Sequence, residues 1–231
     1  MKTKIACLHA HHSNIEYIND AVNLPGTEWI HFVDPGLMAR IAGDPGFDAD
    51  AARNKVAQQV EWIASTGAFA ILITCTNYIA LLDEKMLQSA IPVVKVDEPL
   101  FEYVCGVDGP HVLLFSNPST VDGTMRRLAE HAAANGGNIT DVEPVIIDGT
   151  FQLLMQGNQE AYLEKLTDRI RQILASRPGV TVSVAQLSMV NAARRLEQET
   201  GVRIGHPLLT LGNKLEALLR TISPTRNSSA H

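Results

Sequence analysis

The segment Phe69-Ala-Ile-Leu-Ile-Thr-Cys-Thr-Asn77 decides the fold class of this chain. Its apolar run has no polar alternation, which is typical of a strand that is buried on both faces in the centre of a parallel sheet. A helical pattern over 50–66 precedes the segment, and another over 78–89 follows it. Strand and helix patterns that alternate in this way predict an α/β protein.

The same alternation extends over nearly the whole chain. Further strands are predicted at 4–9, 29–33, 92–96, 111–115, 142–147, 180–185 and 202–206, and further helices at 118–135, 160–176, 189–200 and 207–221. The two halves also align, since Cys75 falls opposite Gln186 and Ile91 falls opposite Val202 at the same spacing of 111 residues. We therefore expect two similar units, each a four-stranded parallel sheet flanked by helices, related by pseudo-two-fold symmetry with the functional site between them.

The expected domain boundary is the turn sequence Gly106-Val-Asp-Gly-Pro110. It divides the chain into a first unit, 1–106, and a second unit, 107–206. The sequence leaves open whether the closing helix, 207–222, packs back on the first unit. Residues 223–231 are expected to form a polar tail.

Composition excludes several functional classes. The formal net charge is −6, the Lys and Arg residues form no block, and aromatic residues are only 5%, so a nucleic-acid partner is not expected. No apolar run approaches the roughly 18 residues of a membrane-spanning helix, and no targeting segment is recognised. Three cysteines in 231 residues are typical of a reducing compartment, so we expect a cytoplasmic location.

Polar side chains follow the predicted strands at their carboxyl ends, where parallel α/β sheets bind ligands. Backbone N–H groups at helix starts, together with hydroxyl and amide side chains, suit a small carboxylate. The residues expected to line such a pocket and bind substrate are His11, Ser13, Asn14, Thr76, Asn77, Ser116, Asn117, Gln186 and Ser188.

Cys75 is the sharpest single feature of the sequence. It ends the central apolar strand and precedes a predicted helix, and a helix start favours the thiolate and lowers the pKa of a cysteine. The alternative is that Cys75 is a small packed residue, as we expect for Cys7 and Cys105.

Two motifs and the amino-terminal strand carry a resemblance to a known family. Ile73-Thr-Cys75-Thr-Asn77, Val184-Ala-Gln186-Leu-Ser188-Met189 and the Leu8-His9-Ala10 start resemble the aspartate/glutamate/hydantoin racemase superfamily. The resemblance covers nearly the whole chain and is nearest to a branch in which the second catalytic cysteine is replaced. It implies the duplicated α/β architecture of that superfamily.

The resemblance also implies a chemistry. Two cysteines, one from each half, flank the α-carbon of a small carboxylate substrate, an amino acid or a relative. One thiolate removes a proton and the opposite thiol delivers another, with no pyridoxal phosphate or metal. Cys75 matches the first catalytic cysteine, and Thr76 and Asn77 match its substrate-binding neighbours. Since members often dimerise, a homodimer is one expected state.

The departure from the family pattern is Gln186, which stands where the second cysteine belongs. A glutamine neither accepts nor donates a proton readily near neutral pH, so two-base racemisation is in doubt. Three outcomes stay open. His11 or His206 replaces the second thiol, Cys75 alone supports a one-base or covalent reaction such as those of the decarboxylase and maleate isomerase members, or the protein binds a small acid without turnover.

A metal site is the rival interpretation. His9-Ala-His11-His12 resembles the start of many metal-dependent hydrolase sites, and His206, Asp34 and Asp97 could complete the ligand shell. We do not expect this metal, because only His9 and His11 can share a side of the strand and a polar turn with surface histidines also explains the motif. No organic cofactor is expected either, because no dinucleotide or phosphate-binding glycine pattern is present.

Overall fold

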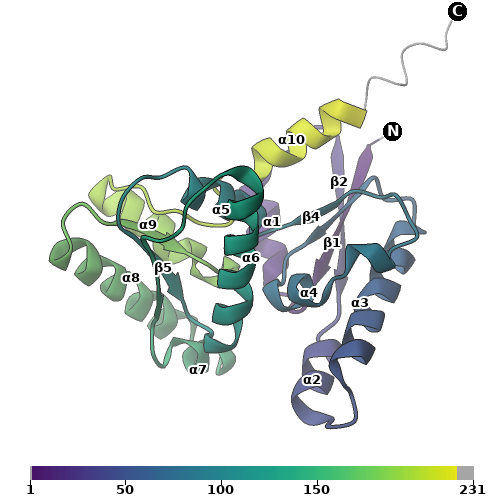
Figure 1. Cartoon of the computed structure of the whole chain (residues 1–231), viewed down its shortest axis with the longest axis horizontal. Helices are drawn as coiled ribbons and strands as arrows, with labels where there is room; N and C mark the ends of the chain where they lie inside the picture. The colour runs from purple at the N-terminus through teal and green to yellow at the C-terminus, as the bar shows by residue number, and fades with distance from the viewer. Residues whose placement is uncertain (1, 223–231) are drawn as a thin grey trace, which may run out of the picture.

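Parallel strands form two separate sheets in the computed structural model, which describes residues 2–222. The first sheet has the order β2-β1-β3-β4, and the second has the order β6-β5-β7. Both are flanked by helices, so the predicted α/β class is confirmed (Figure 1). The predicted polar tail, 223–231, lies outside the described residues. The strands are β1 (Thr3–His9), β2 (Thr27–Val33), β3 (Ala70–Ile73), β4 (Val93–Lys95), β5 (His111–Phe115), β6 (Val142–Ile146) and β7 (Thr181–Val184).

The predicted strand at 202–206 is wrong, so the second sheet has three strands rather than four. Only Gly205 forms an isolated bridge, opposite Ser183 of β7. The chain approaches β7 closely at this glycine, and Pro207, which has no N–H to donate, follows two residues later. The ladder therefore stops after a single residue pair.

Helices connect the strands of the first unit. They are α1 (Asn14–Ala21), α2 (Gly36–Gly43), α3 (Ala49–Ala64) and α4 (Thr76–Leu81). The helix predicted over 78–89 is wrong in its extent, because α4 ends at Leu81 and a short 3₁₀ turn follows at Glu84–Met86. The Asp83 side chain accepts a hydrogen bond from the backbone N–H of Lys85 and starts this new turn. Sequence analysis missed α1 and α2.

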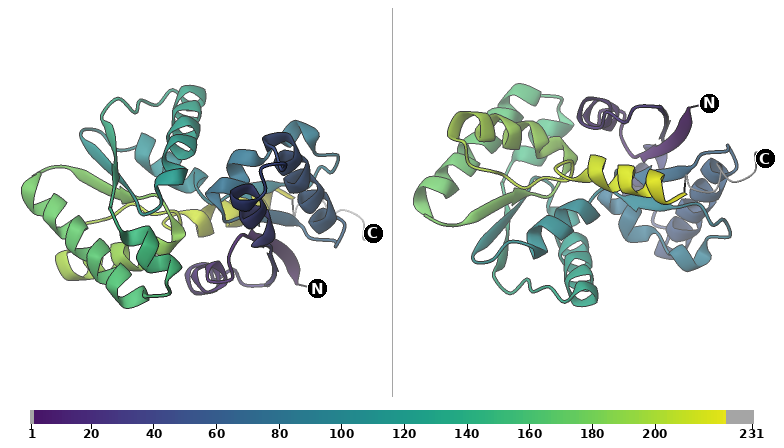
Figure 2. Two further views of the ribbon diagram at one scale, coloured as in Figure 1. Left: turned by 90° about the horizontal axis from the view of Figure 1, so that it is seen from below. Right: turned by 90° about the horizontal axis from the view of Figure 1, so that it is seen from above.

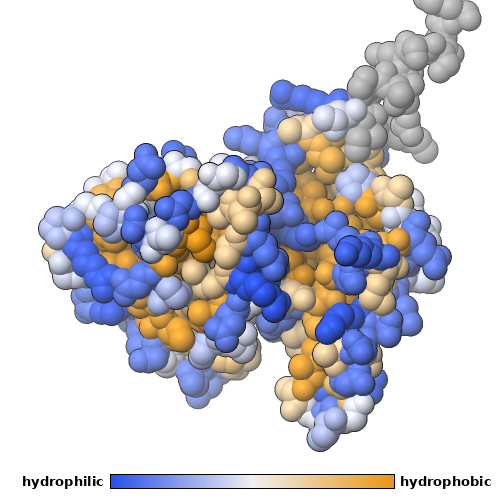
Figure 3. All heavy atoms as spheres, viewed as in Figure 1, coloured by the Kyte–Doolittle hydropathy of each residue, from blue (hydrophilic) through white to orange (hydrophobic). Residues whose placement is uncertain are grey.

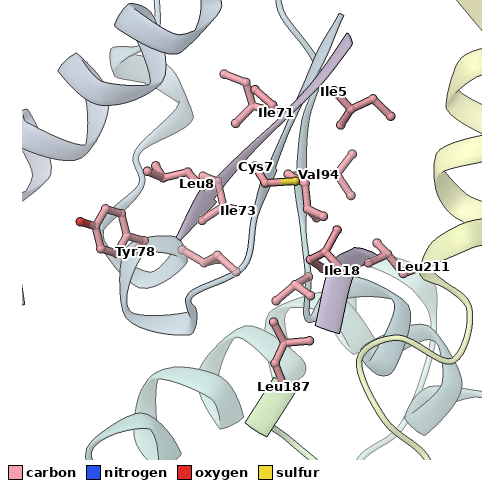
Figure 4. Packing of buried hydrophobic residues seen from close by; sticks show 14 of the residues in the cluster. Ile5, Cys7, Leu8, Ile18, Ile71, Ile73, Tyr78, Val94, Leu187 and Leu211 are labelled. Carbon is pink, nitrogen blue, oxygen red and sulfur yellow. The ribbon is translucent and has the colours of Figure 1, made fainter. Parts of the chain in front are cut away.

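The first core covers both faces of its sheet. Successive side chains of a strand point to opposite faces. Leu8, Ile71 and Ile73 lie on one side with Tyr78, whereas Ile5, Cys7 and Val94 lie on the other with Ile18 of α1 (Figure 4). All of these residues are buried and form one hydrophobic cluster.

The second unit carries α6 (Val121–Asn135), α7 (Thr150–Met155), α8 (Gln159–Ser176) and α9 (Val190–Thr200). One face of its sheet, with Val112 and Val184, packs against α8 and α9. The other face, with Leu113 and Phe115, packs against Leu128 of α6. Helices α6 and α9 end at Gly136 and Gly201, as predicted, and both glycines have the positive φ angle that such helix ends require.

Each unit contributes one helix to the other. Leu100, Phe101 and Val104 of α5 (Glu98–Cys105) pack with β5 and α6 of the second unit. Conversely, Leu211 and Leu215 of α10 (Leu211–Ile222) belong to the core of the first unit. Figures 1 and 2 show α10 reaching from the second unit across the first. Its Lys214 also pairs with Glu98 and Glu102 of α5, at 2.9 and 2.8 Å.

On the face shown in Figure 3, hydrophilic residues lie over the lower part of α6, and weakly apolar residues lie over its upper part. Apolar residues are exposed in smaller groups on both units, and Trp62 of α3 is the most exposed large one, at 68%. None of the helices within residues 2–222 is both long and apolar enough to span a bilayer.

Candidate active site

Cys75 lies where the central strand of the first sheet ends and α4 begins. Strand β3 stops at Ile73, and Cys75 holds the N-cap position with extended backbone angles, φ −110° and ψ 120°. The side chain is half-buried, and Thr76 and Asn77, also half-buried, form the first turn of α4. The thiol therefore stands at the carboxyl edge of the sheet, which is the usual ligand edge.

The protonation of Cys75 differs from the prediction. Burial raises the pKa of the Cys75 thiol above its ordinary value, and the backbone N–H groups of Tyr78 and Asn77 and the charge of Arg127 offset only part of the rise. The expectation of a lowered pKa is thus wrong in its net direction. Helix α4 has only 6 residues, so its N-terminal field is weaker than the cost of removing a thiolate from water.

A buried ion pair joins the two units next to this thiol. Arg127 of α6 donates a hydrogen bond to the carboxylate of Asp97, which follows β4. The Arg127 side chain is 13% exposed and the Asp97 side chain 1%. Arg127 also donates to the carbonyl of Gly123 at 3.2 Å. A guanidinium of the second unit is thereby fixed close enough to Cys75 to lower the pKa of the thiol.

A chain of polar groups lies behind Cys75 in the first unit. The hydroxyl of Thr74 is 2.8 Å from Nδ1 of His9 and accepts a hydrogen bond from Asn14 at 3.3 Å. Nε2 of His9 is in turn 2.9 Å from Nδ1 of His31. Burial, and then the neighbouring His31, lower the pKa of His9 to about 4. The predicted site residue Asn14 is thus connected to the residue that precedes Cys75.

His11 and Ser13 lie apart from this chain. Both are in the turn before α1, where His11 is exposed and Nδ1 of His11 is 2.8 Å from the hydroxyl of Ser13. The backbone N–H of Ser13 also donates to the His11 ring. Within residues 2–222, neither side chain hydrogen-bonds to the other predicted site residues.

The second unit gathers Ser116, Asn117 and Gln186. The amide oxygen Oε1 of Gln186 accepts hydrogen bonds from the backbone N–H and the hydroxyl of Ser116, both at 2.8 Å, and from the backbone N–H of Asn117 at 3.0 Å. Three donors directed at one oxygen form an anion-binding arrangement. In this structure the side chain of Gln186 itself occupies those donors.

Tyr162 connects this group to Ser188, and Tyr17 connects Ser188 to the first unit. The hydroxyl of Tyr162 lies 3.1 Å from Oγ of Ser116 and 2.8 Å from Oγ of Ser188. Burial raises the pKa of Tyr162 to about 12, so its hydroxyl is neutral and able to donate. Tyr17 of α1 donates to the carbonyl of Ser188 at 3.4 Å, across the boundary between the units. The structure thereby connects four predicted residues, namely Ser116, Asn117, Gln186 and Ser188.

The metal site of the rival interpretation is not assembled. Across residues 2–222, no three of the proposed ligands lie close enough to share one ion; these are His9, His11, His206, Asp34 and Asp97. A different group of three has its ligand atoms close together, namely Cys7, His9 and His31. His206 is buried in the second unit, and burial lowers its pKa to about 4. Asp34 accepts instead from the backbone N–H of Gly36 and from Gln59.

Four residues that organise the site are not predicted by the sequence, namely Tyr17, Thr74, Arg127 and Tyr162. Thr74 ends the predicted apolar run, and its place directly before Cys75 at the ligand edge is a signal that could identify it. The other three residues lie in helices without a motif. Only their tertiary contacts identify them.

Comparison with solved structures identifies the fold. No family model matches the sequence, and neither does any curated protein. The chain is similar to an allantoin racemase from Klebsiella pneumoniae, with 16% identity, a TM-score of 0.66 and coverage of 95% of this chain and 89% of that one. It is also similar to an aspartate racemase from Picrophilus torridus, with 12% identity, a TM-score of 0.66 and coverage of 95% of this chain and 94% of that one.

A glutamate racemase from Francisella tularensis shows the same likeness, with 16% identity, a TM-score of 0.65 and coverage of 95% and 82%. At this level of identity the likeness establishes the architecture. The fold expected from the resemblance to the aspartate/glutamate/hydantoin racemases is therefore confirmed.

Proposed function

We propose that this chain, which has the fold of the aspartate, glutamate and allantoin racemases, belongs to their superfamily and is a cofactor-independent racemase/isomerase-like enzyme. Its substrate is a small carboxylate, an amino acid or a relative of one, and Cys75 transfers the proton at the α-carbon. The observation that carries this proposal is the position of Cys75: a half-buried thiol at the ligand edge of β3, with the Arg127 cation of the second unit acting on it.

The substrate carboxylate is held by groups from both units in this proposal. Thr76, Asn77 and Asn14 bind it from the first unit, and Ser116, Asn117 and Ser188 bind it from the second, while His11 and Ser13 border the entrance. Arg127 adds the positive charge that an anionic substrate requires. Because Gln186 already occupies the donors of Ser116 and Asn117, a carboxylate that binds there has to displace its amide oxygen.

Gln186 then orients the substrate and transfers no proton, since an amide does not ionise near neutral pH. His11 and His206 make no hydrogen bond to Cys75 or Gln186 within residues 2–222, so neither is assigned as the second acid or base. Cys75 is left as the one ionisable group of the proposed reaction. We therefore expect one-base chemistry, in which the α-proton exchanges with solvent on one face.

Exchange in deuterated water tests this proposal. L- and D-amino acids and related small carboxylates are incubated with the protein, and loss of the α-proton and inversion are followed by nuclear magnetic resonance. We expect exchange with one enantiomer of the correct substrate, lost in Cys75→Ser. Cys105→Ser, which removes another partly exposed thiol, should keep it. Full activity in Cys75→Ser contradicts the proposal.

A second candidate function is a protein that binds a small acid without turnover, or one that uses Cys75 alone for decarboxylation or covalent isomerisation. The hydrogen bonds that hold Gln186 in place of a second thiol favour it. The same experiment separates the candidates. Binding with neither exchange nor chemical change indicates the binding protein, and a changed product without exchange of the starting acid indicates the one-cysteine reactions.

The proposal includes a cytoplasmic location and a homodimer. The cysteines Cys7, Cys75 and Cys105 are all free thiols, which suits a reducing compartment. Light scattering of the purified chain measures the oligomeric state, and a strictly monomeric protein at all concentrations removes the dimer from the proposal.

A further inference from the structure

Three metal-binding side chains meet on one face of the first sheet. Cys7 and His9 are two residues apart on β1 and so point to the same face, and His31 of β2 is paired in register with Cys7. Their ligand atoms all lie within 4.8 Å of one another. Cys7 and His9 are buried and His31 is half-buried. Figure 4 shows Cys7 on the face that α1 covers.

Both ring nitrogens of His9 contact a neighbour. Nδ1 lies 2.8 Å from the hydroxyl of Thr74, which also contacts Asn14 and the carbonyl of Leu8, each at 3.3 Å. When Nδ1 donates to that hydroxyl, Nε2 of His9 carries a lone pair, and it faces His31.

The proton of His31 is located by Asn19. Nε2 of His31 lies 3.3 Å from Oδ1 of Asn19, an acceptor, so that nitrogen carries the proton. Nδ1 of His31 then bears a lone pair, 2.9 Å from Nε2 of His9, with the thiol of Cys7 beside both nitrogens. In the neutral pair a proton on Nε2 of His9 joins the two nitrogens, and a metal cation takes its place when that proton moves to Nδ1 of His9.

Both imidazoles are able to bind a metal in their neutral form. Burial lowers the pKa of both imidazoles, to about 4 for His9, so the pair is neutral near pH 7. Each ring is also oriented through its other nitrogen by an oxygen atom, Thr74 Oγ1 or Asn19 Oδ1. Metal-binding histidines are typically oriented by such a second hydrogen bond.

We propose that Cys7, His9 and His31 form a binding site for Zn²⁺ in the first unit, connected to the candidate active site through Thr74. The ligands are the thiolate of Cys7, Nε2 of His9 and Nδ1 of His31. Water takes the fourth position, on the side where His31 is half-exposed and Asn19 is exposed.

The geometry requires only small adjustments. Zn–N distances of about 2.0–2.1 Å and tetrahedral angles separate two nitrogens by about 3.3 Å, and a nitrogen and a sulfur by about 3.6 Å. The imidazoles must therefore move apart by a few tenths of an ångström from 2.9 Å, and the thiol must turn inward from within 4.8 Å.

Binding releases one proton to solvent, since the thiol of Cys7 must become a thiolate to ligate the ion. Burial raises the pKa of this thiol strongly, so without a metal it stays protonated. The bound ion and the thiolate leave one net positive charge. That charge is screened through the exposed side of the site, where the water ligand lies.

Cobalt titration of the untagged, chelator-treated full chain tests the site. The background is Cys75→Ser/Cys105→Ser, in which Cys7 is the remaining cysteine. We expect one Co²⁺ per chain, with a thiolate-to-cobalt charge-transfer band that Zn²⁺ abolishes by displacement. Asn19→Ala, which removes the hydrogen bond to His31, should weaken affinity by about 10–100-fold.

His31→Gln and Cys7→Ala should abolish the band, and His12→Gln, an exposed histidine of the same unit, should keep it. Circular dichroism confirms that each variant is folded. If Cys7→Ala does not fold, His31→Gln decides, because His31 is half-buried on the edge strand β2. Absence of the band in the background chain, or its persistence in His31→Gln, overturns the proposal. Neither readout depends on turnover, so the proposed function stands or fails separately.

Discussion

Cys75 is subject to opposing influences from its neighbours. Burial raises the pKa of its thiol, whereas the backbone of α4 and the Arg127 guanidinium lower it. Arg127 is held by Asp97, so the effect of its charge on the thiol depends on a buried ion pair. Removing Arg127 alone leaves Asp97 as an uncompensated buried charge, which typically costs about 3–5 kcal/mol. A test of its effect on the thiol therefore has to neutralise both partners.

Replacing Arg127 should slow alkylation of Cys75. We compare Asp97→Asn with Asp97→Asn/Arg127→Met and follow iodoacetamide labelling of the Cys75 peptide by mass spectrometry. Loss of the cation raises the pKa of the thiol and lowers the thiolate fraction at pH 8. A shift of one pKa unit slows labelling about tenfold. Arg126→Met, on the same helix but with a side chain 67% exposed, should leave the rate unchanged. Equal rates in the Asp97→Asn pair contradict the assigned role of Arg127.

Replacing Gln186 should destabilise the protein. Its amide oxygen is the acceptor for two donors of Ser116 and one of Asn117. Gln186→Ala leaves these donors without that acceptor, and we expect a loss of about 1–3 kcal/mol in the free energy of unfolding, measured in urea. Gln186→Glu restores an acceptor and should recover part of the loss. An unchanged stability in Gln186→Ala means that water replaces the amide fully.

Among the elements, the segment around Gly205 shows how one glycine allows the chain to approach a strand. A Cβ atom placed on Gly205 would lie 2.1 Å from Oγ of Ser183 and 2.5 Å from Cε1 of Tyr103. The chain reaches β7 at this point because glycine has no side chain. Two ladder hydrogen bonds form there, between Val184 N and Gly205 O at 2.8 Å and between Gly205 N and Val182 O at 3.0 Å.

Gly205→Ala should therefore be strongly destabilising. Overpacking of a close contact typically costs about 1–3 kcal/mol, and thermal melting with chemical denaturation measures it. Gly212→Ala is the matched control, because its Cβ would meet only Val22, at 4.0 Å, inside α10. That change should be neutral or stabilising by about 0.5–1 kcal/mol. Equal effects of the two substitutions would show that Gly205 is not closely packed in solution.

The packing of α10 predicts how much stability is lost when one of its buried side chains is shortened. Leu215 is completely buried in the core of the first unit, although the helix follows the second unit in sequence. Leu215→Ala should lower the free energy of unfolding by about 2–5 kcal/mol, as measured in urea. Leu218→Ala, at a partly buried position of the same helix, should cost less. A larger effect at Leu218 would contradict the orientation of α10.

At the scale of the whole molecule, buried histidines link stability to pH. His9 in the first unit and His111 and His206 in the second are each buried, and burial lowers the pKa of each to about 4. In the unfolded chain they titrate near 6.5. Between about pH 6.5 and 4 the unfolded state binds more protons than the folded state, so stability falls as the pH falls.

Stability should be constant above about pH 7 and should decrease below it. Each histidine contributes up to about 1.4 kcal/mol per pH unit within this window. Urea denaturation at a series of pH values measures the slope. His206→Gln removes one of the three groups and should make the dependence less steep by about a third. A slope that is the same in wild type and variant shows that His206 is not buried as a neutral imidazole.

Local pattern explains the parts of the fold that the sequence predicted. The apolar run 69–74 and the strand 111–115 depend on a short stretch of side chains, and the helix ends at Gly136 and Gly201 depend on one residue each. The missed helix α1 follows a polar turn and has only 8 residues, which gives a weak period. The strand expected at 202–206 has a suitable local pattern, but Pro207 has no N–H to continue the ladder after the bridge at Gly205.

The sequence by itself determined the α/β class, the two parallel sheets and the position of Cys75 between a strand and a helix, because each follows from residues that are neighbours in the chain. Only the tertiary structure decided which side chains surround that thiol. Arg127 acts on the thiol from the other unit. His31 of β2 contacts His9 of β1, and the amide oxygen of Gln186 accepts hydrogen bonds from Ser116. These contacts join residues far apart in sequence, and their burial, charge and hydrogen bonds arise only when the two units and their exchanged helices pack together.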